Sequence, residues 1–157
     1  MKRCFFVGHR EATEALMPEL TRLIISHIVE DHVEEFVIGN YGGFDRLAAR
    51  AAAEVKKQYP QIRLVQLQPY LPSEKKEPLP QGFDGGWYPD GMETVPPRYA
   101  IVRANRAAID QADCLIAYVW HTASNAQSML EYAQKRAQNH PLQITLIDRS
   151  GLSSRKL

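Results

Sequence analysis

The sequence contains only two cysteines, and each lies inside a short apolar run. Neither a Cys-x-x-Cys pair nor a zinc-like spacing of Cys and His is present, so we expect no metal site and no disulfide framework. No apolar run approaches the roughly 18–20 residues of a membrane-spanning helix, and the amino terminus has too few apolar residues for a signal peptide. We therefore expect a cytoplasmic protein with no membrane partner.

An excess of charge of one sign is also missing. Lys and Arg number 19 and Asp and Glu number 18, so the 157 residues carry a formal net charge of +1. Because nucleic-acid-binding domains usually show a basic excess, we expect no nucleic-acid partner. The length and the balance of 45% hydrophobic and 24% charged residues are typical of one globular domain, which we expect to span residues 1–157.

Five short apolar runs rich in β-branched and aromatic residues alternate with stretches of helical periodicity. The runs lack polar alternation, which predicts strands covered on both faces, as in a parallel sheet. The predicted strands are residues 4–7, 35–38, 62–67, 114–119 and 143–147, and the predicted helices are residues 16–28, 44–59, 101–110 and 126–138. This order predicts an α/β fold with a Rossmann-like, doubly wound, mainly parallel five-stranded sheet in the strand order 3-2-1-4-5.

A segment after the third strand interrupts this alternation. Residues 69–99 hold seven of the ten prolines and four of the nine glycines, together with Trp87 and Tyr88. A passive connection is rarely so long, and a disordered linker would not be expected to retain these aromatic residues. We therefore predict an insert over residues 71–97 that covers the edge of the sheet as a mobile lid.

Glycine, amide, hydroxyl and cationic side chains follow or flank the predicted strands. In an open α/β sheet, ligands bind beyond the carboxyl ends of the strands. Backbone N–H groups of glycines and the charge of Arg and His suit phosphate and ribose. The predicted ligand-binding residues are Gly8, His9, Arg10, Gly42, Gly43, Asp45, Arg103, Asn105, Ser124 and Asn125.

Each of these features also has a structural interpretation. Gly42 and Gly43 are compatible with a tight turn between strand and helix, and His9 with a buried, hydrogen-bonded histidine. Asp45 suits the positive end of a helix. Arg10 is harder to explain in this way, because a guanidinium directly after a buried strand needs an anion or a carboxylate.

Taken together, four segments resemble the YpsA-like branch of the SLOG superfamily. They are residues 6–10 (FVGHR), 39–45 (GNYGGFD), 67–70 (LQPY) and 104–106 (ANR). The resemblance implies a Rossmann-like fold with a pocket for nucleotide-derived ligands. Some relatives bind or sense such ligands, whereas the lysine-decarboxylase-like phosphoribohydrolases cut the N-glycosidic bond of nucleoside monophosphates.

The hydrolases carry a Gly-Gly-x-Gly-Thr-x-x-Glu loop that this chain matches only in part. In the register that ends at Glu131, Ser124, Asn125 and Gln127 stand where the loop has glycine. Each replacement adds a side chain where backbone would approach phosphate closely. We therefore favour binding or sensing of a nucleotide, NAD or an ADP-ribose-like small ligand, without a cofactor.

Two other functions stay open at this point. One is an N-glycosidic hydrolase of nucleoside monophosphates, in which Glu131 or Asp45 would be the catalytic carboxylate. The other is a protein-interaction module with a vestigial pocket, in which Trp87 and Tyr88 would contact a protein partner. A homo-oligomer is compatible with each of these functions.

Overall fold

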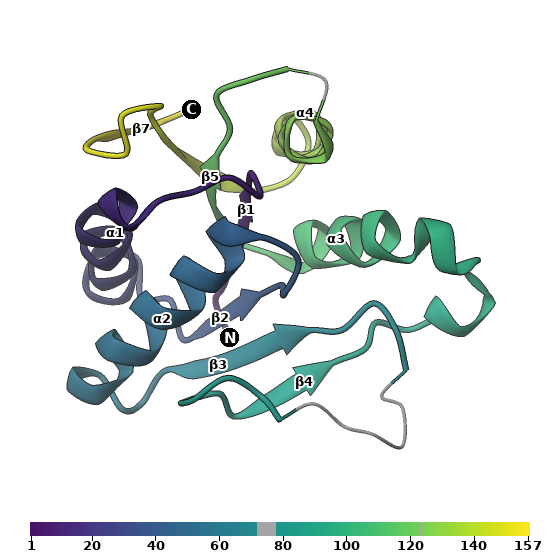
Figure 1. Ribbon diagram of the computed structural model, residues 1–157, viewed down its shortest axis with the longest axis horizontal. Coiled ribbons are helices and arrows are strands. Elements are labelled where there is room, and N and C mark those ends of the chain that lie inside the picture. Colours follow the sequence, from purple (N-terminus) through teal and green to yellow (C-terminus); the bar gives the residue numbers. More distant parts are fainter. Residues whose placement is uncertain (72–77, 123) are drawn as a thin grey trace.

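A mainly parallel sheet runs through the computed structural model, which describes residues 1–71, 78–122 and 124–157 (Figure 1). In these residues it has seven strands, in the order β4-β3-β2-β1-β5-β6-β7. The strands are β1 (Arg3–Gly8), β2 (Glu35–Ile38), β3 (Arg63–Leu67), β4 (Gly85–Trp87), β5 (Cys114–Tyr118), β6 (Gln143–Ile147) and β7 (Ser154–Lys156). The helices are α1 (Met17–Val29), α2 (Gly43–Gln58), α3 (Ala100–Gln111) and α4 (Asn125–Ala137), with single 3₁₀ turns η1 (Glu14–Leu16), η2 (Met92–Thr94) and η3 (Pro97–Tyr99).

The sequence prediction of a Rossmann-like core is confirmed. The five predicted strands correspond to β1, β2, β3, β5 and β6, and their order β3-β2-β1-β5-β6 is the predicted 3-2-1-4-5. Strand β1 lies at the centre and pairs in parallel with both β2 and β5, so that Phe5 is opposite Val37 on one side and Leu115 on the other. A topological switch point therefore lies at the carboxyl end of β1.

Two hydrophobic clusters cover the two faces of this sheet. Apolar side chains of α1 and α2 pack on one face, and those of α3 and α4 pack on the other. Phe44 of α2 and Leu130 of α4 are examples, with at most 5% of either side chain exposed. Coverage on both faces explains why the central strands lack polar alternation.

The predicted number of five strands is wrong, because two short edge strands extend the sheet. Strand β7 pairs with β6 antiparallel, and β4 pairs with β3 in parallel. Edge strands are often short and polar or glycine-rich, so Gly85-Gly86-Trp87 and Ser154-Arg155-Lys156 give no apolar signal in the sequence.

Strand β4 also changes the interpretation of the predicted insert at 71–97. Trp87 lies opposite Leu67 of β3, and both Trp87 and Tyr88 are partly buried against the core on the α3 and α4 face. The lid prediction is therefore wrong for these two aromatic residues, because Trp87 belongs to the edge strand β4 and Tyr88 follows it directly. Residues 72–77 of the predicted insert lie outside the described residues.

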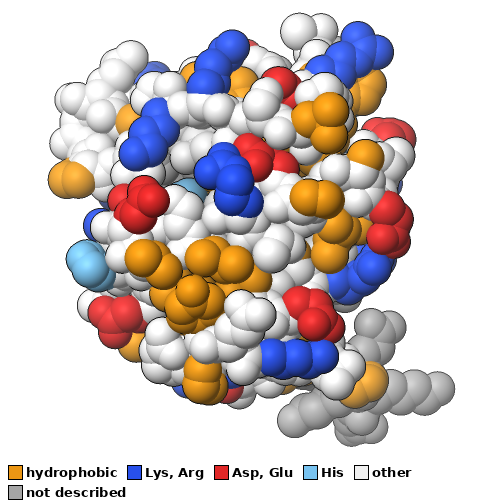
Figure 2. Space-filling view, turned by 90° about the vertical axis from the view of Figure 1, so that its left-hand side faces the viewer, with side chains coloured by type: hydrophobic (Ala, Val, Ile, Leu, Met, Phe, Trp, Pro, Cys, Tyr) orange, Lys and Arg blue, Asp and Glu red, His pale blue; other side chains and the backbone are white. Residues whose placement is uncertain are grey.

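The side of the molecule that carries α1 and α2 is shown in Figure 2. Hydrophobic side chains gather in a patch near the centre of this face, and Lys, Arg, Asp and Glu side chains surround it.

Among the helices in the described part of the chain, none is long and apolar enough to cross a membrane.

Candidate functional site

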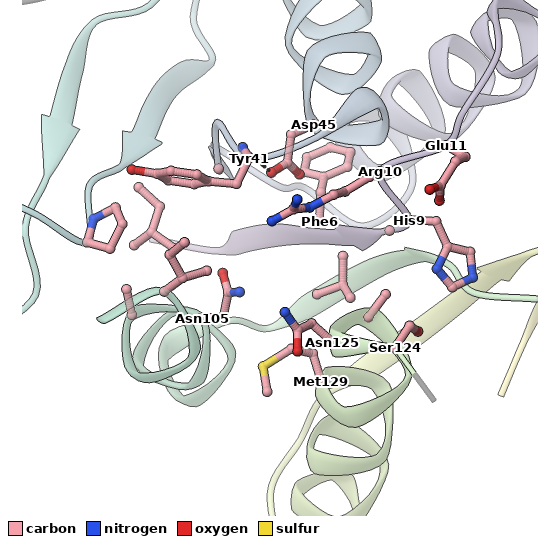
Figure 3. A pocket seen from close by; sticks show the side chains of 18 of the residues that line it. Phe6, His9, Arg10, Glu11, Tyr41, Asp45, Asn105, Ser124, Asn125 and Met129 are labelled. Atoms are coloured by element: carbon pink, nitrogen blue, oxygen red, sulfur yellow. Dashed lines mark hydrogen bonds between the residues drawn. The ribbon is translucent and has the colours of Figure 1, made fainter. Parts of the chain in front are cut away.

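A cavity of about 270 Å³ lies at the carboxyl ends of the central strands, where the strand order reverses. Figure 3 shows side chains from both halves of the sheet converging on it. The predicted binding residues that line it are Gly8, His9, Arg10, Asp45, Asn105, Ser124 and Asn125. Leu67, Ile101, Ala104 and Met129 add apolar surface, so the cavity combines polar groups with an apolar wall.

Arg10 follows β1 and is held through its backbone by the start of α2. The Gly43 N–H donates to the Arg10 carbonyl oxygen at 2.8 Å, and the Phe44 N–H donates to the His9 carbonyl oxygen at 3.3 Å. Gly42 has φ 155° and ψ 177°, a conformation that is essentially restricted to glycine, and a Cβ at Gly43 would overlap the Arg10 carbonyl oxygen. Gly42 and Gly43 therefore support the Arg10 loop and do not line the cavity.

The Arg10 side chain lies at the cavity without a carboxylate partner, unlike Arg50 on α2. It is exposed at the cavity and has no ion pair or hydrogen bond with the residues that the structure describes. Arg50, on the outer side of α2, pairs with Glu14 at 2.5 Å beside a second hollow of about 490 Å³. Arg10 thus keeps its charge available at the first cavity, whereas Arg50 at the second hollow is neutralised by Glu14 and Arg46 beside it has no ion pair with the described residues.

His9 connects the ends of β1 and β5. Its backbone N–H donates to the Tyr118 carbonyl oxygen at 3.3 Å, and its Nε2 accepts the Trp120 N–H at 2.9 Å and the His121 N–H at 3.4 Å. The His9 ring is buried and stacks on the His121 ring, with centroids 3.7 Å apart. Because Nε2 accepts two N–H groups, the ring must be neutral with its proton on Nδ1.

Burial lowers the pKa of His9 from its ordinary value of 6.5, and the neighbouring His121 lowers it further. The pKa of Asp45 shifts in the opposite direction, also because of burial. Burial raises the pKa of Asp45 from 3.8 to about 6, although a hydrogen bond from the Tyr41 N–H and the charge of Arg46 oppose this effect. Both shifts favour the neutral form of the group.

We expect the pH dependence of stability to reveal the neutral His9. Below about pH 6.5 the unfolded chain binds a proton that the folded His9 resists, so the free energy of unfolding should fall as pH is lowered, by at most ~1.4 kcal/mol per pH unit for one histidine. His27, whose pKa burial also lowers, acts in the same direction. Asp45 opposes them below about pH 6, because protonation there favours the folded state.

Comparison with His9→Gln isolates the contribution of His9. Urea denaturation from pH 7.5 to pH 5 should show a shallower loss of stability in this variant than in the wild type, because glutamine stays neutral and can still accept the Trp120 N–H. Identical slopes in the two proteins would contradict a neutral His9 in the folded state.

Two further predicted site residues lie outside the cavity, as the paired glycines of the α2 turn do, and a third has an additional structural role. Arg103 is exposed on α3, and Glu131 is exposed on α4, and neither lines the cavity. Glu131 Oε1 accepts a hydrogen bond from Gln127 Nε2 at 3.1 Å. The third, Ser124, does line the cavity, but its hydroxyl also caps α4 by accepting the Gln127 N–H at 3.1 Å.

Three aromatic residues at or beside the cavity are absent from the predicted set: Tyr41 lines it, and Tyr70 and Trp120 are the chain neighbours of Pro69 and His121, which also line it. Tyr41 and Tyr70 meet edge to face with ring centroids 6.4 Å apart, and they are 40% and 42% exposed. Trp120 is 37% exposed, and the Arg149 guanidinium lies 4.5 Å from the centre of its ring. Their positions within three residues of the ends of β2, β3 and β5 were the sequence signal that could have identified them.

Within the described part of the chain, no group of three or more His, Cys, Asp and Glu side chains is placed to hold a metal ion. The amide and hydroxyl groups of Asn105, Asn125 and Ser124, together with Arg10, suit hydrogen bonding to an anionic or polar ligand.

Comparison with known proteins gives structural neighbours only. No known family matches the sequence, and no curated protein matches it either. DNA processing protein A from Helicobacter pylori matches with a TM-score of 0.58 at 18% identity, over 91% of this chain and 64% of that one. DNA processing protein A from Streptococcus pneumoniae matches with a TM-score of 0.63 at 15% identity, over 94% of this chain and 50% of that one. This likeness shows the fold.

The chain therefore spans between half and about two thirds of the length of these two neighbours. The two matches support the Rossmann-like fold predicted from the sequence, whereas membership of the SLOG superfamily stays a prediction. The YpsA-like branch stays a prediction.

These neighbours correct two predictions about ligands. The Helicobacter pylori protein is described by its single-stranded DNA binding mode. On this comparison, the prediction of a small nucleotide-derived ligand is wrong, and so is the prediction that no nucleic-acid partner is expected. Net charge was a weak basis for the second prediction, because it averages over the whole surface and does not report local groups of charge.

Proposed function

We propose that this chain binds single-stranded nucleic acid across the cavity at the carboxyl end of the sheet. The observation that carries the proposal is the position of Arg10, an available cation in a cavity that Tyr41 lines, with Tyr70 against Tyr41 and with Trp120 next to the lining residue His121. Binding of single strands without strong sequence preference commonly combines backbone contacts by cations with stacking of bases on aromatic rings.

Arg10 is suited to one backbone phosphate. Its guanidinium is always charged at physiological pH and presents several N–H donors in one plane, which match two phosphate oxygens. Its backbone is fixed by the hydrogen bond from Gly43, so little conformational entropy of the main chain is lost on binding.

The three aromatic residues are suited to neighbouring bases. Tyr41 and Tyr70 lie on the side of β2 and β3, whereas Trp120 lies beyond β5. Stacking needs bases whose faces are accessible, which a single strand offers and a duplex does not. The single-stranded DNA binding of the Helicobacter pylori neighbour, which shares the fold, supports the same class of ligand.

Fluorescence anisotropy with a labelled oligonucleotide of mixed sequence tests the proposal. We expect the single strand to bind at least about tenfold more tightly than the same sequence as a duplex. Because Arg10 and at most a few other cations meet phosphates, the affinity should fall only gently with salt, by a slope of about −0.7 in log K per phosphate contact.

The Tyr70 ring provides a variant arm of this experiment. Tyr70→Ala should weaken binding by ~1–3 kcal/mol, the contribution of one stacked base. Tyr70→Phe is the matched control, since it keeps the ring and loses only the hydrogen bond from Tyr70 Oη to the Pro97 carbonyl oxygen. Equal binding of duplex and single strand, or no binding of either at low salt, would overturn the proposed function.

A further inference from the structure

A carboxylate lies inside the cavity beside the arginine, and phosphate binding does not explain it. Asp45 is in the first turn of α2 and is half-buried. Figure 3 shows its side chain pointing into the cavity between Tyr41 and Arg10. Its Oδ2 accepts the Tyr41 N–H at 3.2 Å, and the described residues supply no hydrogen-bond donor to Oδ1.

The unpaired oxygen of Asp45 needs a donor from the ligand. A carboxylate repels phosphate, and a polar atom that stays unsatisfied when a ligand displaces its water costs free energy. Glu11, the other carboxylate at the cavity, is exposed and stays accessible to water. Asp45 is therefore placed to accept a hydrogen bond from a neutral hydroxyl or amino group of a bound strand.

The position of Arg10 indicates which group this is. The hydrogen bond from the Gly43 N–H to the Arg10 carbonyl oxygen, at 2.8 Å, ties the Arg10 loop to the turn of helix that carries Asp45. A phosphate held by Arg10 is bonded directly to a sugar, so the sugar lies next to the phosphate on this wall. From a sugar in this position, the apolar wall and Tyr41 are within the same cavity and available to a base.

We propose that the cavity selects RNA over DNA, with the free oxygen of Asp45 accepting a hydrogen bond from one ribose 2′-hydroxyl; this inference rests on the proposed single-strand binding. The 2′-hydroxyl is the donor that distinguishes ribose from deoxyribose. A pKa of about 6 leaves Asp45 mostly ionised at pH 7.5, so it is an acceptor under the conditions of the test.

The experiment compares RNA and DNA of the same length and base sequence at pH 7.5, with uracil in both so that only the sugar differs. We expect the Kd for RNA to be at least about tenfold lower than the Kd for DNA, since a hydrogen bond to a charged group contributes at least that factor. A series of RNA strands with one 2′-deoxy residue each should lose most of this preference at a single position. This series needs no variant protein.

The variant Asp45→Ala separates the hydrogen bond from the charge. Loss of the negative charge changes the interaction with the phosphates of RNA and of DNA by the same amount, and loss of the hydrogen bond affects RNA alone. The ratio of the two Kd values therefore reports the sugar contact alone. We expect this ratio to fall to about one. Glu54→Gln is the matched control, because it removes the same charge from the exposed outer side of α2 and should leave the ratio unchanged.

Each outcome has a distinct meaning. Equal Kd values for RNA and DNA in the wild type would overturn the inference while the proposed single-strand binding stands. A preference that Asp45→Ala leaves intact would overturn it as well, and so would a preference that follows base identity and not the sugar, since Asp45 would then read an amino group of a base. Failure of both strands to bind would overturn the proposed function itself.

Discussion

Replacement of Arg10 by alanine should weaken binding of a single-stranded oligonucleotide by about 10- to 150-fold, which corresponds to the ~1.5–3 kcal/mol of a hydrogen bond to a charged group. The effect should be large because Arg10 has no carboxylate partner among the described residues, so its charge is available to a phosphate. Anisotropy titrations at two salt concentrations measure it. The slope of log K against log salt should also become less negative by about 0.7, as one phosphate contact is lost.

Two further variants show whether the geometry of the guanidinium or the charge alone is responsible. Arg10→Lys keeps the charge but loses the two-pronged contact, so its affinity should lie between those of the wild type and Arg10→Ala. Arg50→Ala removes one positive charge from the exposed ion pair with Glu14, and we expect a change of less than about twofold in Kd. Equal losses for Arg10→Ala and Arg50→Ala would show that only net charge matters and would contradict the assignment of Arg10.

The sequence was sufficient for the central fold because burial on both faces leaves a strong pattern. The run that contains Phe5 and the run that contains Leu115 are apolar throughout. They form β1 and β5, which pair with each other at the centre of the sheet. The edge strands β4 and β7 are three residues long and have no such pattern. Their pairing depends on tertiary contacts with β3 and β6, which a local reading of the sequence does not contain.

The site was predictable in its place but less so in its details. Residues after β1 and at the start of α4 were expected at one edge because parallel strands end together, and the cavity lies there. The sequence left both a turn and ligand binding open for Gly42 and Gly43, and only their contact with the Arg10 backbone, between two loops far apart in the sequence, decides for the turn. The structural role of His9 likewise depends on the Trp120 N–H, more than a hundred residues away.

Phe44→Ala should cause the largest loss of stability among the changes considered, about 3–5 kcal/mol in the free energy of unfolding. The Phe44 side chain is fully buried, and its ring lies 6.5 Å from that of Phe6 and 5.9 Å from that of Tyr118, measured between centroids. Removing the ring opens a cavity below the loop that carries Arg10. Urea denaturation measures the loss, and Phe83→Ala, a partly buried phenylalanine at the margin of the same core, should cost clearly less.

Gly8 gives a sharper test of how closely α2 approaches β1. A Cβ at Gly8 would overlap the Phe44 ring, so Gly8→Ala should cost about 1–3 kcal/mol by overpacking. In a Phe44→Ala background the ring carbons that the new methyl group would overlap are absent, and only the Cβ of residue 44 remains close to it. The cost of Gly8→Ala should therefore be lower there, and a double-mutant cycle should give a coupling of at least ~0.5 kcal/mol. Strictly additive costs would mean that Gly8 and Phe44 are not in contact, and that the helix carrying Asp45 does not pack against the end of β1 as described.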